Sequence, residues 1–178
     1  MDSINQNQKE DNFKNLMGEE AVEKIKQLAK KGGACLFCTK IVTGEAFSTR
    51  PMAPEEIDDD GNFWFLSASD SDKNMELEAD PNAQLLFQGS SYSDFLSLYG
   101  KVTISRDKQK IEQLWDVLHK NWFTEGKEDP RITVLKFTPA SGYYWDTKHG
   151  STVAFVKSVV GSIIGQTYDD SIEGNIKP

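Results

Sequence analysis

The stretch from Phe47 to Pro81 constrains the fold more than any other part of the sequence. Its first residues alternate in side-chain direction, as a strand does. Pro51 and Pro54 keep that strand out of the centre of a sheet, because proline donates no ladder hydrogen bond. An acidic run then ends at Gly61-Asn62, a turn signal, and the apolar segment Phe63–Ser67 follows. The stretch therefore predicts two short strands joined by a turn.

The residues after the second predicted strand favour an anion site. A hydroxyl-rich loop from Ser67 to Lys73 precedes a short predicted helix, from about Asn74 to Asp80. The start of such a helix suits a phosphate, because its free backbone N–H groups point outward. The turn between the strands would bring Arg50 near this loop, where Arg50 and Lys73 supply charge and donors. A surface hairpin followed by an Asp/Ser helix cap fits the same pattern, and the pattern alone does not separate the two.

Three other segments have helical periodicity. Residues Gly18–Lys31 are amphipathic, with apolar side chains on one face. Residues Asp107–Trp122 repeat large apolar side chains at helical spacing, which favours core packing, and His119 is expected on the surface of this helix. Residues Ser151–Ile164 carry an apolar stripe, and a helix there would pack on its own barrel or across a dimer.

The remaining segments are short and strand-like. They are Cys35–Val42, Ala83–Gln88, Phe95–Ser105, Ile132–Phe137 and Tyr143–Trp145. Gly100 predicts a bulge within one of them, while Pro139 and Gly142 predict a turn between the last two. With three or four helices and six or seven mostly sequential strands, the pattern indicates an α+β, mainly β fold. We expect an antiparallel barrel, closed or split, with flanking helices.

The length of 178 residues fits one domain. We expect a folded domain over 18–165, a disordered N-terminal tail over 1–17 and a polar C-terminal tail over 166–178. No apolar run approaches the roughly 18 residues of a membrane span, and the first residues lack the apolar core of a secretory signal, so we expect a cytoplasmic protein with no membrane partner. A net charge of −8 argues against nucleic acid, for which a basic stripe is typical.

Two cysteines, Cys35 and Cys38, have C-x-x-C spacing, which is compatible with a redox or zinc site. Zinc needs two further ligands, and the only histidines, His119 and His149, are far apart in the sequence. The apolar residues around both cysteines favour buried structural thiols and no metal site.

The chain resembles the pyridoxamine 5′-phosphate oxidase-like FMN-binding split barrels, and among them the general stress protein branch. The resemblance covers roughly Glu20 to Asp146. It rests on the order and spacing of the segments Ser48-Thr49-Arg50-Pro51-Met52, Phe63-Trp64-Phe65-Leu66-Ser67, Ser71-Asp72-Lys73-Asn74, Asp80-Pro81-Asn82-Ala83, Leu85-Leu86-Phe87 and Tyr99-Gly100-Lys101-Val102.

The resemblance implies a cofactor site. It gives Arg50 the FMN phosphate, and it lays the backbone of Pro51 and Met52 against the flavin ring. It also assigns the hydroxyl of Ser67, and the loop residues Ser71 and Lys73. The full expected set is Thr49, Arg50, Pro51, Met52, Leu66, Ser67, Ser71, Lys73 and Trp145. For Trp145 the alternative is core packing, because aromatic clusters are usually core.

Two residues depart from the oxidase pattern. Asp72 stands where the oxidases have an arginine, and Glu55 stands where they have a lysine. Both changes remove positive charge from the expected phosphate and substrate region. We expect Asp72 to point outward and to cap the helix near Asn74.

The resemblance also implies a homodimer with FMN at its interface. It suggests a flavin-dependent oxidoreductase, in which the flavin does the redox chemistry and no side chain has to act as a general acid or base. The alternatives are a flavin or other cofactor carrier without turnover in stress response, and a structural dimer with an empty cleft. The sequence does not identify the small-molecule redox partner.

Overall fold

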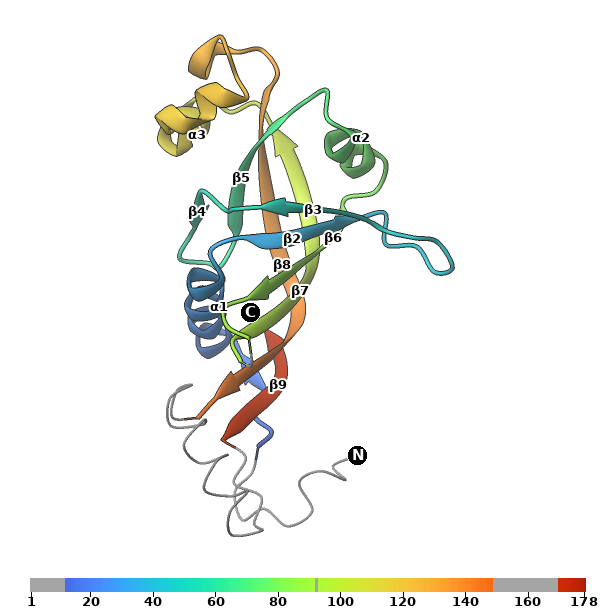
Figure 1. Cartoon of the computed structure of the whole chain (residues 1–178), viewed down its shortest axis with the longest axis vertical. Coiled ribbons are helices and arrows are strands. Elements are labelled where there is room, and N and C mark those ends of the chain that lie inside the picture. Colours follow the sequence, from blue (N-terminus) through green and yellow to red (C-terminus); the bar gives the residue numbers. More distant parts are fainter. Residues whose placement is uncertain (1–11, 92, 149–169) are drawn as a thin grey trace.

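A computed structural model describes residues 12–91, 93–148 and 170–178 (Figure 1). In these ranges nine strands, three α-helices and two short 3-10 helices follow one another. The strands are β1 (Leu16–Met17), β2 (Cys35–Thr39), β3 (Ser48–Met52), β4 (Glu56–Ile57), β5 (Phe63–Ala68), β6 (Asn82–Gln88), β7 (Phe95–Ser105), β8 (Ile132–Thr147) and β9 (Ser171–Lys177). The helices are α1 (Glu19–Gly32), α2 (Asp72–Ala79), α3 (Lys108–Leu114), η1 (Val117–Asn121) and η2 (Gly126–Glu128).

The strands form one strongly curved sheet. Its order is β1-β9-β8-β7-β6-β2-β3, and β5 joins it by pairing with β8. Every pair is antiparallel except β1 with β9. Seven strands have five or more residues, in line with the predicted number. Because β3 ends the path without pairing with β5 in the described chain, the barrel is split there, and the mainly β fold with flanking helices is confirmed.

The acidic run forms a hairpin of its own. It places the short strand β4 against β5, so the expected direct hairpin between the Arg50 strand and β5 is wrong. The Asp58 carboxylate organises the turn, since it accepts hydrogen bonds from the backbone N–H groups of Asp60 (3.1 Å) and Asn62 (2.8 Å). It also accepts a hydrogen bond from the Trp64 indole at 2.9 Å, which ties the turn to the start of β5.

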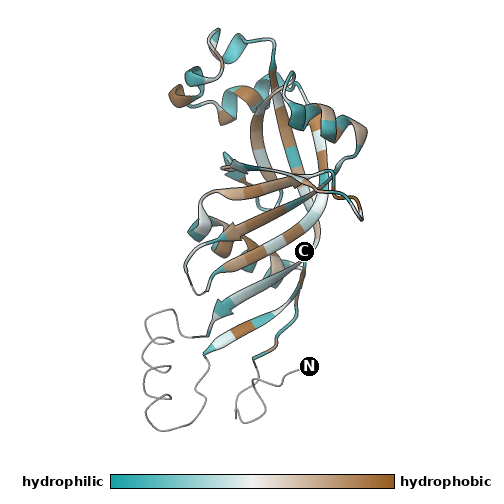
Figure 2. Ribbon diagram, turned by 45° about the vertical axis from the view of Figure 1, so that its right-hand side comes forward, coloured by the Kyte–Doolittle hydropathy of each residue, from teal (hydrophilic) through white to brown (hydrophobic). Residues whose placement is uncertain are grey.

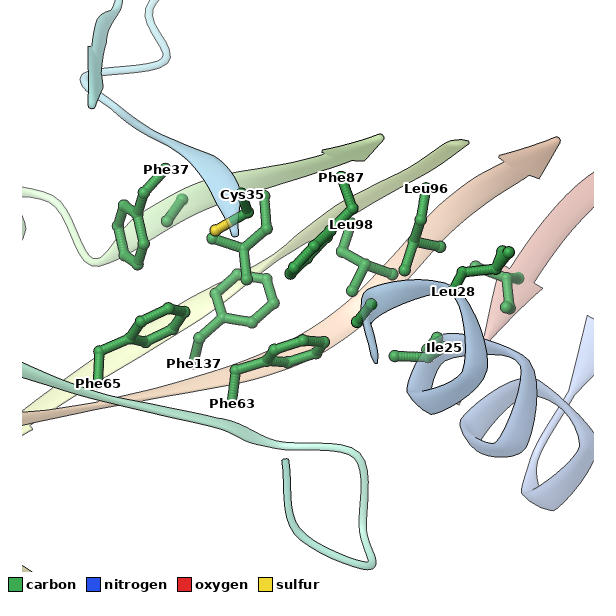
Figure 3. Packing of buried hydrophobic residues seen from close by; sticks show 14 of the residues in the cluster. Ile25, Leu28, Cys35, Phe37, Phe63, Phe65, Phe87, Leu96, Leu98 and Phe137 are labelled. Atoms are coloured by element: carbon green, nitrogen blue, oxygen red, sulfur yellow. The ribbon is translucent and has the colours of Figure 1, made fainter. Parts of the chain in front are cut away.

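The core lies between the curved sheet and α1 (Figure 3). Aromatic rings from four strands point toward one another there, with Phe37 and Phe65 edge to face at 5.3 Å between centroids. Helix α1 closes one end of this cluster with Ile25 and Leu28, as the amphipathic pattern predicts. Full burial of one such side chain stabilises the fold by roughly 1.5–3 kcal/mol. Figure 2 shows hydrophobic residues concentrated on the strands in the middle of the molecule.

Both cysteines are buried free thiols, which confirms the expected burial. Cys35 points into the aromatic cluster, and burial raises the pKa of its thiol to about 12 (Figure 3). Cys38 lies on the other face of β2, where the Thr49 hydroxyl donates to its sulfur at 3.2 Å. In the described chain no group of three or more His, Cys, Asp or Glu side chains is placed to hold a metal ion.

Strand β8 is continuous, so the predicted turn at Pro139 and Gly142 is wrong. Pro139 and Gly142 instead flank a β-bulge, since the register of β8 with β7 shifts between Tyr99 and Gly100. A Cβ on Gly100 would lie 2.2 Å from the backbone oxygen of Thr138, and a Cβ on Gly142 would lie 2.3 Å from that of Ser97. The two glycines allow this close approach of β7 and β8.

The helix predicted over Asp107–Trp122 is interrupted. Asp107 caps α3, but Trp115 and Asp116 are extended, and Asp116 caps η1 by accepting from the backbone N–H of Leu118. Aspartate favours a cap over a helix interior, which explains the break. His119 is buried rather than on the surface: its Nδ1 accepts from Asp116 N–H, and its Nε2 lies 2.8 Å from Glu55.

The two expected tails contribute to the sheet. Residues 171–177 form β9 between β8 and β1, which corrects the expectation of a loose tail over 166–178. Leu16 and Met17 pair with β9, so regular structure begins before residue 18, where the folded domain was expected to start. A Cβ on Gly174 would lie 2.1 Å from the backbone oxygen of Lys14, a contact that only glycine permits. The predicted helix over Ser151–Ile164 and the tail residues 1–11 lie outside the described residues.

None of the helices found in the described ranges has the length and apolarity to cross a membrane.

Candidate functional site

Arg50 lies at the end of the barrel that α2 covers. It pairs with Phe37 across β2 and β3, so its side chain is directed to the inner face of the sheet. Its guanidinium donates to the Glu76 carboxylate on α2 at 2.7 Å and to the Thr39 hydroxyl at 2.5 Å. Strand β3 is therefore linked to α2 through Arg50, the residue that the family resemblance assigns to the FMN phosphate.

Glu76 is the acceptor at the centre of this arrangement. Thr39 donates to one carboxylate oxygen at 2.5 Å, and Ser48 donates to the other at 2.8 Å. Burial alone raises the pKa of Glu76, but the hydrogen bonds from Thr39, Ser48 and Arg50 and the charge of Arg50 outweigh it and lower the pKa to about 2. Glu76 is therefore ionised at neutral pH and neutralises Arg50.

Lys73 is the second cation of the site, and it is half-buried. Among the described residues no carboxylate lies within ion-pair distance of its ammonium, and no side chain or backbone group accepts a hydrogen bond from it. Burial lowers the pKa of Lys73 to about 8, with a further contribution from the neighbouring Arg50. Arg50 has Glu76 as its ion-pair partner and Lys73 has none among the described residues, which leaves an uncompensated positive charge in a partly desolvated place.

The hydroxyls expected to bind the cofactor hold α2 in place. Ser67 donates to the Asn74 amide oxygen at 2.6 Å, and Asn74 donates to the Thr133 hydroxyl at 2.8 Å. Ser71 is the N-cap of α2, since its side chain accepts from the backbone N–H of Asn74. Asp72 is exposed and is the first helical residue, so the expectation that Asp72 caps the helix is wrong. An acidic side chain in the first turn still favours the helix dipole.

Other expected residues do not join this cluster. Leu66 packs on the opposite face of β5 from Ser67, in a second buried cluster with Ile111 and Leu114 of α3. Glu55, the other departure from the oxidase pattern, is paired with His119. Its carboxylate therefore anchors η1 to the segment that follows β3.

Trp145 is remote from Arg50 within one chain. Strands β2, β6 and β7 separate the two residues, and Trp145 pairs with Phe95 on the face opposite the core. Its ring lies 4.6 Å from that of Tyr143 and its side chain is 43% exposed, so the core-packing alternative does not apply. Further exposed residues on the same outer face are Leu36, Thr49, Pro51 and Tyr99.

The alternation of β3 divides the expected residues in two. Arg50 and Met52 are directed inward, whereas Thr49 and Pro51 are on the outer face with Leu36. One edge of β3 pairs with β2, and the other pairs with no strand of the described chain. A planar ligand along that edge would contact backbone and side chains of both faces.

Sequence reasoning missed Glu76 and Asn74. Glu76 follows Lys73 by three residues, and residues at that spacing lie on one face of a helix, so a helical pattern from Ser71 contained the signal. Asn74 had no comparable signal, because its partners Ser67 and Thr133 are far apart in the sequence.

A cavity of about 480 Å³ lies elsewhere, between α1 and the strands β1, β8 and β9. Three of its four charged side chains are in ion pairs: Lys24 pairs with Asp146 at 2.9 Å, and Lys14 pairs with Glu20. The Tyr144 hydroxyl donates to the backbone oxygen of Lys14 at 2.8 Å. Because these groups are already paired, the cluster around Arg50 and Lys73 is the stronger candidate site.

Comparisons with known proteins agree with this architecture. The family model described as pyridoxamine 5′-phosphate oxidase like matches residues 20–169. A structure assigned to general stress protein 26 of Jannaschia sp. CCS1 is 25% identical, covers 88% of this chain and 97% of that chain, and has a TM-score of 0.72. No curated protein matches.

Two more distant structures share the fold. A protein related to general stress protein 26, of the pyridoxinephosphate oxidase family, from Clostridium acetobutylicum is 21% identical; the match covers 72% of this chain and 89% of that chain, with a TM-score of 0.59. The general stress FMN/FAD binding protein of Xanthomonas citri is also 21% identical, with 70% of this chain and 87% of that chain covered and a TM-score of 0.58.

Proposed function

Because the chain belongs to the pyridoxamine 5′-phosphate oxidase-like family, we propose that it is a cytoplasmic general stress protein that binds FMN at the interface of a homodimer. Solved relatives named as general stress and FMN/FAD binding proteins support this proposal. The observation that carries it is Lys73, a half-buried ammonium that has no protein partner in the described chain and lies beside Arg50.

An unpartnered buried cation is costly to the fold, and a phosphate ester offsets that cost by supplying the missing charge. Arg50 has five N–H donors and uses one on Glu76 and one on Thr39, so others remain for a ligand. Lys73 and Arg50 therefore fit the FMN phosphate, with Ser71 at the start of α2 beside them.

The flavin ring would lie along the open edge of β3. Thr49, Pro51 and Met52 present backbone and side chains there, and Ser67 fixes the neighbouring end of α2. Leu66 would contact the flavin only through its backbone, because its side chain is buried under α3. When bound, FMN supplies the redox chemistry, while these residues bind and orient it.

The outer face of the sheet supports the proposed homodimer. Three large apolar or aromatic residues on this face, Leu36, Tyr99 and Trp145, have between 41% and 47% of their surface exposed. Such exposed side chains suit contact with a second copy of the chain. In such a dimer, Trp145 of the partner subunit would flank the flavin held by Arg50 and Lys73. This placement gives Trp145 a role that one chain alone does not allow.

We further propose that the bound flavin makes the protein an oxidoreductase that takes electrons from a small-molecule donor. A flavin carrier without turnover is the second candidate. It requires the same phosphate contacts, since Arg50 and Lys73 would hold the phosphate whether or not the flavin turns over.

Flavin titration tests binding, and anaerobic mixing with NADH or NADPH tests turnover. We expect purified protein to quench FMN fluorescence at one flavin per chain, and riboflavin, which lacks the phosphate, to bind more weakly. Bleaching of the flavin absorbance by a nicotinamide donor would support the oxidoreductase. Binding without bleaching would support the carrier, and no FMN binding would overturn the proposal.

A further inference from the structure

Glu76 accepts a hydrogen bond from the same Arg50 guanidinium that would bind the phosphate of the ligand. Its carboxylate accepts hydrogen bonds from three side chains of β2 and β3, so α2 is docked with Glu76 directed into the site. Its side chain is 13% exposed and that of Arg50 is 23% exposed, so water screens the pair only in part. Such a carboxylate lies close to any phosphate that binds Arg50.

We infer that Glu76 determines the strength of phosphate binding: it orients Arg50 but cancels its charge, so that FMN is held weakly and exchangeably by one uncompensated cation, Lys73. This inference rests on the proposed FMN site. It assigns Glu76 as a positioning and affinity-determining residue, and it does not require Glu76 to contact the flavin.

The charges lead to this conclusion directly. At neutral pH the site holds Arg50 and Lys73 as cations and Glu76 as an anion, so its net charge is one positive unit. A phosphate monoester carries between one and two negative charges at that pH. Lys73 alone does not neutralise a dianion, and the Glu76 carboxylate repels it.

The geometry also indicates that Glu76 remains in place when a ligand binds. Arg50 uses one N–H on Glu76 and one on Thr39, and its other donors have no acceptor among the described residues. The carboxylate need not leave, since Thr39 and Ser48 hold it independently of Arg50. Its repulsion therefore acts in the bound state and lowers affinity.

Glu76→Gln is the informative substitution, because glutamine keeps the shape and removes the charge. The amide oxygen can accept from Arg50 and Thr39, and the amide nitrogen can donate to Ser48, whose hydroxyl also accepts. Glu78→Gln is the matched control: Glu78 lies two residues further along α2, is exposed, and loses the same charge.

FMN and riboflavin titrations of wild type and both variants test the inference. We expect Glu76→Gln to bind FMN about ten- to a hundredfold more tightly, with riboflavin affinity changed by less than about twofold. Glu78→Gln should leave both affinities within about twofold of wild type, because it is exposed and screened. Melting curves without ligand verify that the variants fold, and Glu76→Met, which also lacks the charge, replaces Glu76→Gln if that variant does not.

The outcomes separate this inference from the proposed function. Tighter FMN binding in Glu76→Gln supports it, whether wild type binds weakly or not detectably; in the latter case the proposed FMN function of the wild type falls while the inference stands. If wild type binds FMN and Glu76→Gln binds it equally or more weakly, the inference is overturned and the function stands. If neither protein binds FMN, both are overturned.

Discussion

The Asn74 side-chain amide donates a 2.8 Å hydrogen bond to the Thr133 hydroxyl, and this contact joins α2 to β8 across the end of the barrel. Both residues are buried, and Ser67 completes the network by donating to the Asn74 oxygen. Lys73 precedes Asn74 and Glu76 follows it by two residues on the same short helix. The position of both charged groups beside Arg50 therefore depends on a neutral, buried hydrogen-bond network.

Asn74→Ala should destabilise the protein by about 2–4 kcal/mol. The substitution removes the acceptor of the Ser67 hydroxyl and the donor to the Thr133 hydroxyl, which keeps only its hydrogen bond to the Ser67 backbone oxygen. Each buried group that loses such a partner costs about 1–3 kcal/mol. Urea unfolding followed by far-UV circular dichroism measures the loss. Met75→Ala is the control on the same helix, because Met75 is 54% exposed, and it should change stability by no more than about 0.5 kcal/mol. Equal stability of the two variants would contradict a structural role for the network.

Lys73→Met should stabilise the ligand-free protein and weaken FMN binding. The pKa of Lys73 is about 8 in the folded state and near its ordinary 10.5 in the unfolded state, so the unfolded state binds the proton more tightly. The charged form therefore costs stability below pH 8, roughly 1–3 kcal/mol, and the cost fades as pH rises from about 8 to 10.5.

Thermal melts at pH 7 and pH 10 check this pH dependence of stability. The variant should melt higher than wild type at pH 7, and the gap should narrow at pH 10. Its FMN affinity at pH 7 should fall about ten- to a hundredfold, since a charged hydrogen bond is worth about 1.5–3 kcal/mol. A Lys73→Met protein that melts below wild type at pH 7 would show that Lys73 has a favourable partner.

Glu76 should contribute acid sensitivity. Its folded pKa is about 2, below its ordinary 4.5, so its contribution to stability is fully present above about pH 4.5 and is lost as pH falls toward 2. The contribution is roughly 2–3 kcal/mol after allowance for partial solvent screening. Glu76→Gln should lack this part of the acid dependence, so the stability difference between wild type and variant should shrink between pH 6 and pH 3. Glu78→Gln, measured by the same urea titrations, should keep the full acid dependence.

Local patterns were sufficient for the elements whose partners are near in sequence. The apolar face of α1 and the alternation in β7 predicted both elements from their own residues. The pairing of β9 with β8 and β1 was not predictable in this way, because it joins residues 171–177 to segments far from them in the chain. Asp116 shows a third case: its capping preference was visible, but the apolar spacing around it favoured a continuous helix.

The candidate site divides in the same manner. The sequence predicted that Arg50 and Lys73 lie close together through a hairpin that does not form, and the structure brings them together by docking α2 against β2 and β3 instead. The neutralisation of Arg50 by Glu76 depends on how α2 docks on β2 and β3, which no local pattern encodes. The exposure of Trp145 likewise depends on which face of β8 meets the core.

Subunit mixing tests whether each FMN site is built from two chains. Lys73→Met and Trp145→Ala each remove one group from the proposed site, and loss of the Trp145 ring should weaken FMN binding on the order of tenfold. If the partner's Trp145 completes the site, a mixed dimer of the two variants has one intact site and one site with both defects. Random mixing then restores about a quarter of all sites, since about half of the dimers are mixed.

Mixing wild type with the Lys73→Met/Trp145→Ala double variant is the matched control. A two-chain site predicts that every mixed dimer carries two defective sites, so only about a quarter of sites remain intact. A one-chain site predicts the opposite pattern, with no restoration between the single variants and about half of the sites intact in the control. FMN titration after unfolding and refolding the mixtures, at a concentration that fills wild-type sites but leaves the single variants mostly empty, distinguishes the two. Because Trp145 and Arg50 are separated by three strands in one chain, we expect the two-chain pattern.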